Sequence, residues 1–115
     1  MRRTVKPKLK VWVVFDDRVK FGDGRAELLE AIERLGSIKK AVTRSGMSYR
    51  HAWGYLRELE SAAGCKFLER RQGAGPAGGA RLTKEGRAFL ARYRRFRLGL
   101  DRVVQRHFTK SFRRT

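Results

Sequence analysis

Hydrophobic residues recur at spacings of three and four in three successive stretches between residues 25 and 63. Such spacing places them on one face of a helix, so we expect three consecutive amphipathic helices there. The predicted inward-facing residues are Leu28, Leu29, Ile32 and Leu35 in the first helix, Ile38, Ala41 and Val42 in the second, and Ala52, Leu56, Leu59 and Ala63 in the third.

Capping residues mark the ends of these three helices. Asp23, Ser37 and Ser48 each precede a helix and can accept a hydrogen bond from its free amides. Gly36 ends the first helix, and Gly46 ends the second because glycine tolerates the left-handed conformation of a helix end. The second and third helices, separated by this glycine-containing break, form a predicted helix-turn-helix.

Two short hydrophobic stretches before the helices predict a β-hairpin. Residues 9–15 are rich in Val and aromatic side chains, and residues 19–21 return after a polar turn at 16–18. The aspartates of that turn are expected to form the turn and not a catalytic pair. We expect the hairpin to cover one side of the helical core.

A second pair of strands is predicted after the helix-turn-helix, over residues 65–71 and 81–82. The glycine-rich connection at 72–80 makes this pair a wing, with Arg70, Arg71 and Arg81 at its base. A phosphate-binding nucleotide loop is the alternative interpretation. It is disfavoured because no Gly-Lys-Ser/Thr closes the loop and no strand-loop-helix order surrounds it.

A long helix, capped by Thr83, is predicted to begin at residue 84 and to run to residue 107. Its hydrophobic residues recur at spacings of 4, 3, 4 and 3, which is a short heptad seam. This seam can form a dimer interface, which we favour, or pack on the core of its own chain. The seam comprises Phe89, Tyr93, Phe96, Leu100 and Val103, and the rest of the helix carries Arg87, Arg92, Arg94, Arg95, Arg97, Arg102 and Arg106.

The outward face of the third predicted helix has a composition suited to a nucleic-acid groove. Arg50, Gly54 and Arg57 fall opposite the hydrophobic stripe, with Tyr49 and Trp53 beside them. Arginine can donate two hydrogen bonds to a guanine edge, and an aromatic ring can contact a thymine methyl or stack. A solvated helix face with two arginines is the simpler alternative.

Charge favours the nucleic-acid interpretation. The 115 residues include 29 Lys and Arg against 11 Asp and Glu, a formal net charge of +18. An excess of this size on one small domain favours a polyanionic partner, and nucleic acid is the commonest one. A membrane surface is the rival, but no hydrophobic run approaches the roughly 18 residues of a transmembrane helix.

A cytoplasmic location is expected, because no signal peptide is recognised and the single Cys65 agrees with a reducing compartment. We expect Cys65 to be a small buried residue. His51 and His107 are not spaced as metal ligands, and Cys65 has no adjacent base. No enzyme activity, metal or cofactor is therefore predicted.

These elements predict an α+β, mainly α fold: a winged helix-turn-helix with an N-terminal β-hairpin and a long C-terminal dimerisation helix. The expected organisation is a flexible basic arm at residues 1–8, the DNA-binding domain at 9–83, the dimerisation helix at 84–107 and a basic tail at 108–115.

The sequence resembles the amino-terminal DNA-binding domain of the ModE molybdate-responsive regulators and, more distantly, that of the LysR regulators. Both families sense small molecules in further carboxy-terminal domains, for which this chain has no counterpart, so we predict no effector-binding domain here. The residues that carry the resemblance are Gly22–Leu29, Gly36–Ile38, Ser48 and Tyr49, Ala52 and Trp53, Phe67–Arg70, the glycine-rich wing, and Leu82, Thr83 and Gly86.

The resemblance implies a winged helix-turn-helix that dimerises through its terminal helices and reads a palindromic operator. We therefore predict a transcription regulator that binds double-stranded DNA as a homodimer. The predicted base contacts are Tyr49, Arg50, Trp53, Gly54 and Arg57, and the predicted phosphate contacts are Ser37, Ser48, Arg70, Arg71 and Arg81.

Two other nucleic-acid functions remain as alternatives. An architectural DNA-binding protein with little sequence preference suits the charge equally well, although it has little use for outward-facing Tyr49 and Trp53. A protein for single-stranded DNA or RNA usually needs exposed aromatic side chains on a sheet, for which only Trp12 is a candidate.

Overall fold

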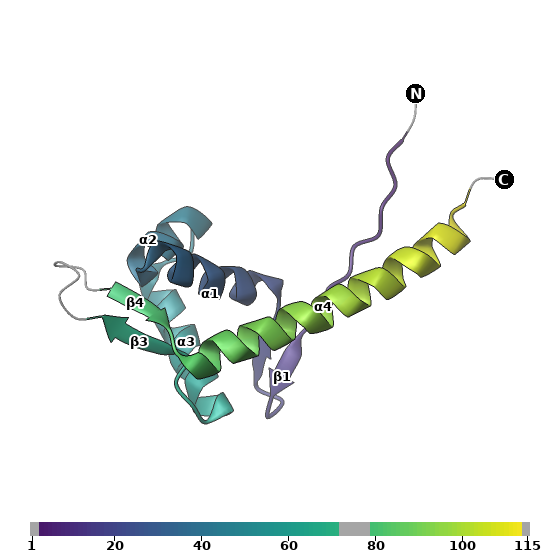
Figure 1. Cartoon of the computed structure of the whole chain (residues 1–115). Coiled ribbons are helices and arrows are strands. Elements are labelled where there is room, and N and C mark those ends of the chain that lie inside the picture. Colours follow the sequence, from purple (N-terminus) through teal and green to yellow (C-terminus); the bar gives the residue numbers. More distant parts are fainter. Residues whose placement is uncertain (1–2, 72–78, 114–115) are drawn as a thin grey trace.

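The computed structural model of the chain describes residues 3–71 and 79–113, and it confirms the mainly α winged helix-turn-helix (Figure 1). A two-stranded hairpin precedes three helices, and a second hairpin and a long helix follow them. The elements are β1 (Val13–Phe15), β2 (Val19–Phe21), α1 (Asp23–Leu35), α2 (Ile38–Ser45), α3 (Tyr49–Ala63), β3 (Leu68–Arg71), β4 (Gly79–Leu82) and α4 (Lys84–Ser111).

The hydrophobic stripes of α1, α2 and α3 meet in one core, as their spacing predicted. Tyr55 was missed from the predicted inward face: it is 8% exposed, and its hydroxyl donates to the Lys20 carbonyl at 3.2 Å. Burial, which disfavours the phenolate, raises the pKa of Tyr55. This bond ties α3 to the N-terminal hairpin.

The caps of the helix-turn-helix are confirmed. The hydroxyl of Ser37 accepts a hydrogen bond from the Lys40 amide at 3.2 Å, and that of Ser48 accepts one from the His51 amide at 3.0 Å. Gly46 ends α2 with a φ of 77°, in the left-handed region. Local chemistry alone therefore sets the ends of the motif.

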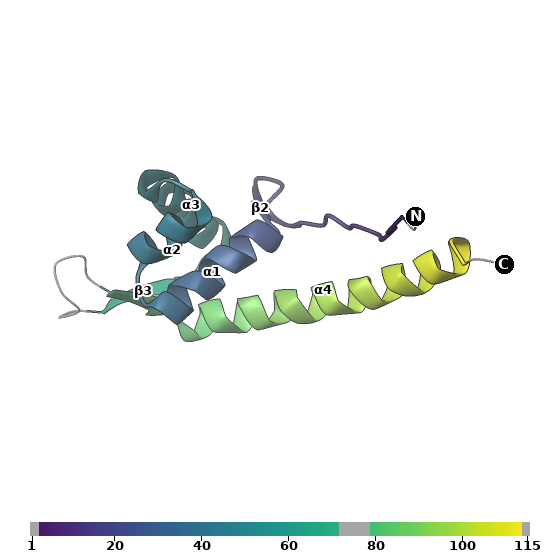
Figure 2. The same ribbon diagram turned by 90° about the horizontal axis from the view of Figure 1, so that it is seen from above.

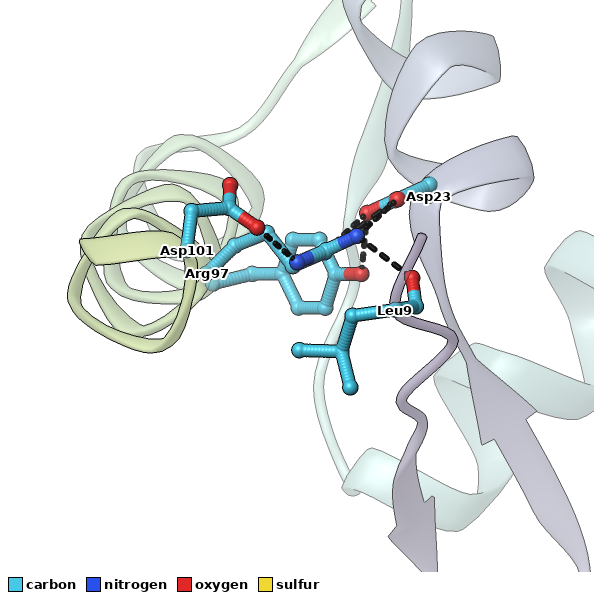
Figure 3. A network of polar contacts seen from close by, with 5 residues as sticks. Leu9, Asp23, Arg97 and Asp101 are labelled. Atoms are coloured by element: carbon cyan, nitrogen blue, oxygen red, sulfur yellow. Dashed lines mark hydrogen bonds and ion pairs between the residues drawn. The ribbon is translucent and has the colours of Figure 1, made fainter. Parts of the chain in front are cut away.

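Asp23 has a different role from the predicted cap. Gly22 occupies the cap position of α1 with no side-chain cap, and the helix begins at Asp23 itself. The Asp23 carboxylate instead accepts hydrogen bonds from the Tyr93 hydroxyl at 2.6 Å and from Arg97 Nε at 3.1 Å (Figure 3). Arg97 also donates to the Leu9 carbonyl at 2.7 Å. This network joins the first turn of α1, the middle of α4 and the N-terminal segment.

The Asp23 network predicts a loss of stability in acid. Hydrogen bonds from Arg97 and Tyr93 hold the pKa of the Asp23 carboxyl below its usual range. A lowered folded-state pKa contributes stability that is present above the unfolded value, about pH 4, and is lost as the pH falls through the folded value. We expect the free energy of unfolding of the wild-type protein to fall more between about pH 5 and about pH 2 than that of the Asp23→Asn variant. Urea unfolding at a series of pH values measures both. Parallel curves for the two proteins would contradict this role.

The acidic face of α1 packs beside basic residues of α4. Glu30 forms a bidentate ion pair with Arg94, and Glu33 lies 3.5 Å from Arg87. The acidic face of α1 therefore meets a basic surface of the same chain. Three of the seven arginines predicted on the last helix, counting Arg97, are therefore paired with α1.

The predicted dimer seam needs a correction at its first two positions. Tyr93 is only 2% exposed, and the Phe89 ring lies 5.3 Å from Phe15, 4.7 Å from Phe21 and 5.2 Å from Phe67. Phe89 and Tyr93 therefore cover the aromatic side chains of the hairpin and the wing base. Periodicity showed that the seam shares one face but could not show that the chain's own core lies against its first half.

The second half of α4 extends beyond that core. Phe96 and Val103 are 45% and 40% exposed, and Leu100 is half-buried. The helix continues to Ser111, past the predicted end at residue 107, so the first part of the predicted tail is helical. α4 therefore presents a long face that the described residues leave uncovered (Figure 1).

The N-terminal hairpin is shorter than predicted. Residues 9–12 belong to no strand, and β1 begins at Val13. The polar turn is confirmed: Asp16 and Asp17 have φ values of 50° and 55°, a conformation that aspartate tolerates better than most residues. No helix in the described ranges could cross a membrane, since none is both long and apolar enough.

Candidate nucleic-acid interface

The exposed face of α3 borders a hollow of about 490 Å³ at the surface. Its walls come from two elements that the sequence predicted separately, the second motif helix and the wing. Tyr49 is 44% exposed, and Arg50, Gly54 and Arg57 are exposed beside it. The hollow is lined by Tyr49, Arg50, Trp53, Gly54, Arg57 and Arg70.

Trp53 lies at the centre of this group and is half-buried rather than fully outward-facing. Two guanidinium groups flank its indole ring, that of Arg70 at 5.1 Å and that of Arg57 at 5.9 Å from the ring centroid. Tyr49 makes an edge-on contact with the same ring at 6.3 Å. Cation–π contacts of this kind are worth about 0.5–1 kcal/mol at exposed sites. Trp53 therefore contacts an arginine of α3 and an arginine of the wing.

Gly54 leaves open space on this face. A Cβ atom built at Gly54 would meet no atom within 4 Å. The described residues therefore give no packing reason for a glycine, although glycine in a helix costs about 1 kcal/mol relative to alanine.

The wing base carries arginines that differ in whether an acidic residue of the chain already pairs with them. Arg70 is exposed and lies over Trp53, whereas Arg81 forms a 2.6 Å ion pair with Glu69 on the adjacent strand. The wing loop at 72–78 and the side chain of Arg71 lie outside the described residues, so those predicted contacts are not located. Arg70 is the wing residue that the structure brings together with α3.

The two predicted phosphate-binding serines differ as well. Ser48 is exposed at the start of α3. Ser37 is only 7% exposed and its hydroxyl is used in the cap of α2. Ser37 therefore has a structural role in the cap, and its predicted phosphate contact stays a prediction.

Glu60 is a residue of this site that sequence reasoning missed. Its Oε2 accepts hydrogen bonds from the amides of Phe67 and Leu68 at 2.8 and 3.1 Å, so the last turn of α3 holds the start of β3. The sequence shows Glu60 only as a carboxylate two residues after Glu58, and its hydrogen-bond partners lie after the Gly64 turn. Only the folded chain brings them within reach.

Replacement of Glu60 by alanine is expected to lower the free energy of unfolding by about 1–3 kcal/mol, because two amides lose a charged acceptor. Glu60→Gln keeps one acceptor oxygen and should lose less. Glu58→Ala is the control, since Glu58 is exposed on the same helix. Urea unfolding measures all three, and an equal loss for Glu58→Ala and Glu60→Ala would contradict the anchoring role.

No group of three or more His, Cys, Asp or Glu side chains suited to a metal ion occurs in the described part of the chain. Cys65 is half-buried, less enclosed than predicted. The interface is thus built from arginine and aromatic side chains, which can bind phosphates and base edges.

Comparison with known proteins places the chain among regulatory proteins. Residues 25–87 match the family model of bacterial regulatory helix-turn-helix proteins of the lysR family. The matched segment runs from α1 to the first turn of α4 and so contains the whole hollow.

Individual relatives agree with the family match. The chain is 38% identical over 88 residues to the molybdenum transport protein ModE of Azotobacter vinelandii, covering 73% of this chain and 33% of that protein. It is 32% identical over 92 residues to the molybdenum-pterin-binding protein MopB of Rhodobacter capsulatus, covering 80% and 34%. It is 33% identical over 69 residues to the DNA-binding transcriptional dual regulator ModE of Escherichia coli K12, covering 60% and 26%. The chain spans about a third of the length of the first two relatives.

Proposed function

Because the chain belongs to the lysR family of bacterial regulatory helix-turn-helix proteins and resembles the N-terminal domain of ModE, we propose that it binds double-stranded DNA and regulates transcription. The observation that carries this proposal is the convergence of α3 and the wing on one arginine-lined hollow. An arginine-rich surface of this kind complements the phosphate backbone and base edges of a duplex.

In this proposal α3 enters the major groove and the wing lies on the adjacent backbone or minor groove. Arg50 and Arg57 face base edges, Ser48 and Arg70 contact phosphates, and Trp53 holds Arg57 and Arg70 in register. This preorganisation lowers the cost of ordering two long side chains on binding.

We further propose that the protein binds as a homodimer to a palindromic site. Phe96, Leu100 and Val103 are the part of the predicted seam that remains available, because Phe89 and Tyr93 belong to the core. Exposed apolar side chains in the extended half of α4 support this surface as the one that a second copy covers.

Selection of binding sites from a randomised duplex pool at physiological salt tests the function. An enriched palindrome bound about a thousandfold or more tighter than a scrambled duplex would support the dimeric regulator. A pool that stays random, with equally steep salt dependence for both duplexes, would instead support the architectural alternative.

Gly54→Ala should affect folding and binding in opposite directions. The site is open, so alanine should raise the free energy of unfolding by about 1 kcal/mol through helix propensity. Affinity for the selected duplex should fall if the groove wall approaches the α3 backbone at this position. Gly24→Ala, an equally open and exposed glycine on α1, is the control and should leave affinity unchanged. Unaltered affinity of Gly54→Ala would show that nothing comes close there.

A further inference from the structure

Five basic side chains of α4 form a row that the proposed interface does not use. At 100° per residue they share one side of the helix, at spacings of three, seven, four and four. All are exposed. We name this row the α4 basic stripe, and its members are Arg92, Arg95, Arg102, Arg106 and Lys110.

The stripe differs from the other arginines of α4 in having no acidic partner. Arg87, Arg94 and Arg97 form ion pairs with α1 residues, whereas no stripe residue forms one with any described carboxylate. All 11 acidic residues of the chain lie within the described ranges. Five positive charges on one helix face therefore remain without internal compensation.

The position of the stripe separates it from the α3 hollow. Tyr93 marks the packed side of α4, and the stripe residues lie about 100° to 180° from it on the helical wheel. Figure 2 shows α1 between α3 and α4, so the side of α4 that faces away from α1 also faces away from α3. The stripe therefore faces away from a duplex held by α3 and the wing.

The length and chemistry of the stripe suit a nucleic-acid backbone. From Arg92 to Lys110 a helix rises about 27 Å, close to a turn of B-DNA at about 34 Å. Four of the five residues are arginines, whose guanidinium groups bind phosphate well. No aromatic residue belongs to the row, so it has the features of backbone binding and not of base reading.

We propose that the α4 basic stripe binds the phosphate backbone of a second DNA segment, so that a protein bound through α3 can bridge two duplexes. The first contact rests on the proposed function. The second is independent of sequence, because the stripe contacts phosphates and no base edge.

A sandwich assay tests the bridge. The selected duplex is immobilised, the protein is bound to it, and capture of a labelled duplex of unrelated sequence is measured as a function of salt. The test variant carries Arg92→Gln, Arg95→Gln, Arg102→Gln and Arg106→Gln, and glutamine is chosen because it keeps helix propensity. The control carries Arg3→Gln, Lys6→Gln, Lys8→Gln and Lys10→Gln, which removes the same charge from the exposed N-terminal segment.

The test variant should lose capture of the second duplex, and the slope of log affinity against log salt for this step should fall by about 3 to 4. Its affinity for the immobilised duplex should stay close to that of the control variant. Circular dichroism should give equal helix content for all three proteins.

Three results would overturn the bridge. Unchanged capture by the stripe variant would mean that other surfaces hold the second duplex. An equal loss of second-duplex capture in both variants would mean that capture depends on the net charge of the protein and not on the stripe. Weaker binding to the immobilised duplex in the stripe variant only would mean that the stripe contacts that first duplex. A randomised pool that yields no preferred site would defeat the sequence-specific regulator. The sandwich assay would then be run with an arbitrary immobilised duplex, so the bridge is tested separately.

Discussion

Gly86→Ala is expected to lower the free energy of unfolding by about 1–3 kcal/mol, the usual cost of forcing an extra carbon into a packed site. A Cβ atom built at Gly86 would lie 2.4 Å from the Phe67 carbonyl oxygen and 3.1 Å from the Phe67 carbonyl carbon. The obstacle is backbone, so a change of side-chain rotamer cannot relieve it.

Phe67 cannot move away cheaply, because several contacts hold it. Its amide donates to Glu60, its carbonyl accepts from the Thr83 amide at 2.9 Å, and its ring is 1% exposed. Close approach of α4 to the start of the wing therefore requires glycine at position 86. The substitution should disturb the wing before the rest of the fold.

Urea unfolding of Gly86→Ala and Gly99→Ala checks this expectation. Both glycines lie on α4, but Gly99 has no neighbour within 4 Å of a built Cβ. Gly99→Ala should therefore stabilise the protein by about 1 kcal/mol through helix propensity. Stabilisation by both alanine substitutions would show that the backbone at Phe67 moves away from the added Cβ atom at little cost.

Arg50→Ala is expected to weaken binding to the selected duplex by about 10- to 100-fold, since a good bidentate arginine contact discriminates against a wrong base by about 1–3 kcal/mol. Arg50 is exposed on the hollow and forms no ion pair with the described carboxylates. Its guanidinium is therefore free to meet a base edge. Folding should be unaffected, because no core contact is removed.

The loss on a scrambled duplex should be much smaller. Arg18→Ala, which removes the same charge from the exposed hairpin turn, is the matched control and should weaken both duplexes slightly and equally. Fluorescence anisotropy titrations with the two duplexes at one salt concentration measure all of these affinities. Equal losses on both duplexes for Arg50→Ala would make Arg50 a phosphate contact.

The local part of the fold was predictable because its causes are local. Hydrophobic spacing sufficed for the buried stripes of α1, α2 and α3, and the hydroxyl groups of Ser37, Ser48 and Thr83 cap helices as predicted. The face that carries Arg50, Gly54 and Arg57 was also predictable, since a helix with one buried stripe must expose the opposite side.

Tertiary structure alone decided which surfaces cover which. A repeating seam shows that Phe89 and Phe96 share a face, but the hairpin and wing base cover only the first. Asp23 is a plausible cap by its position, yet Tyr93 and Arg97, about 70 residues away, provide its hydrogen bonds. Such pairings depend on how elements that are far apart in the chain pack together. The local sequence pattern does not determine this packing.

The same division applies to the proposed interface. Residue types and helical periodicity determined that α3 exposes arginines and aromatic side chains and that the chain carries a large positive charge. Packing decided that Arg70 joins Trp53 and Arg57, and that Ser37 is buried. It also decided that α1 neutralises three arginines of α4 and leaves the basic stripe uncompensated. Composition counts charges, whereas only the distances between them in the folded chain determine which remain available to a partner.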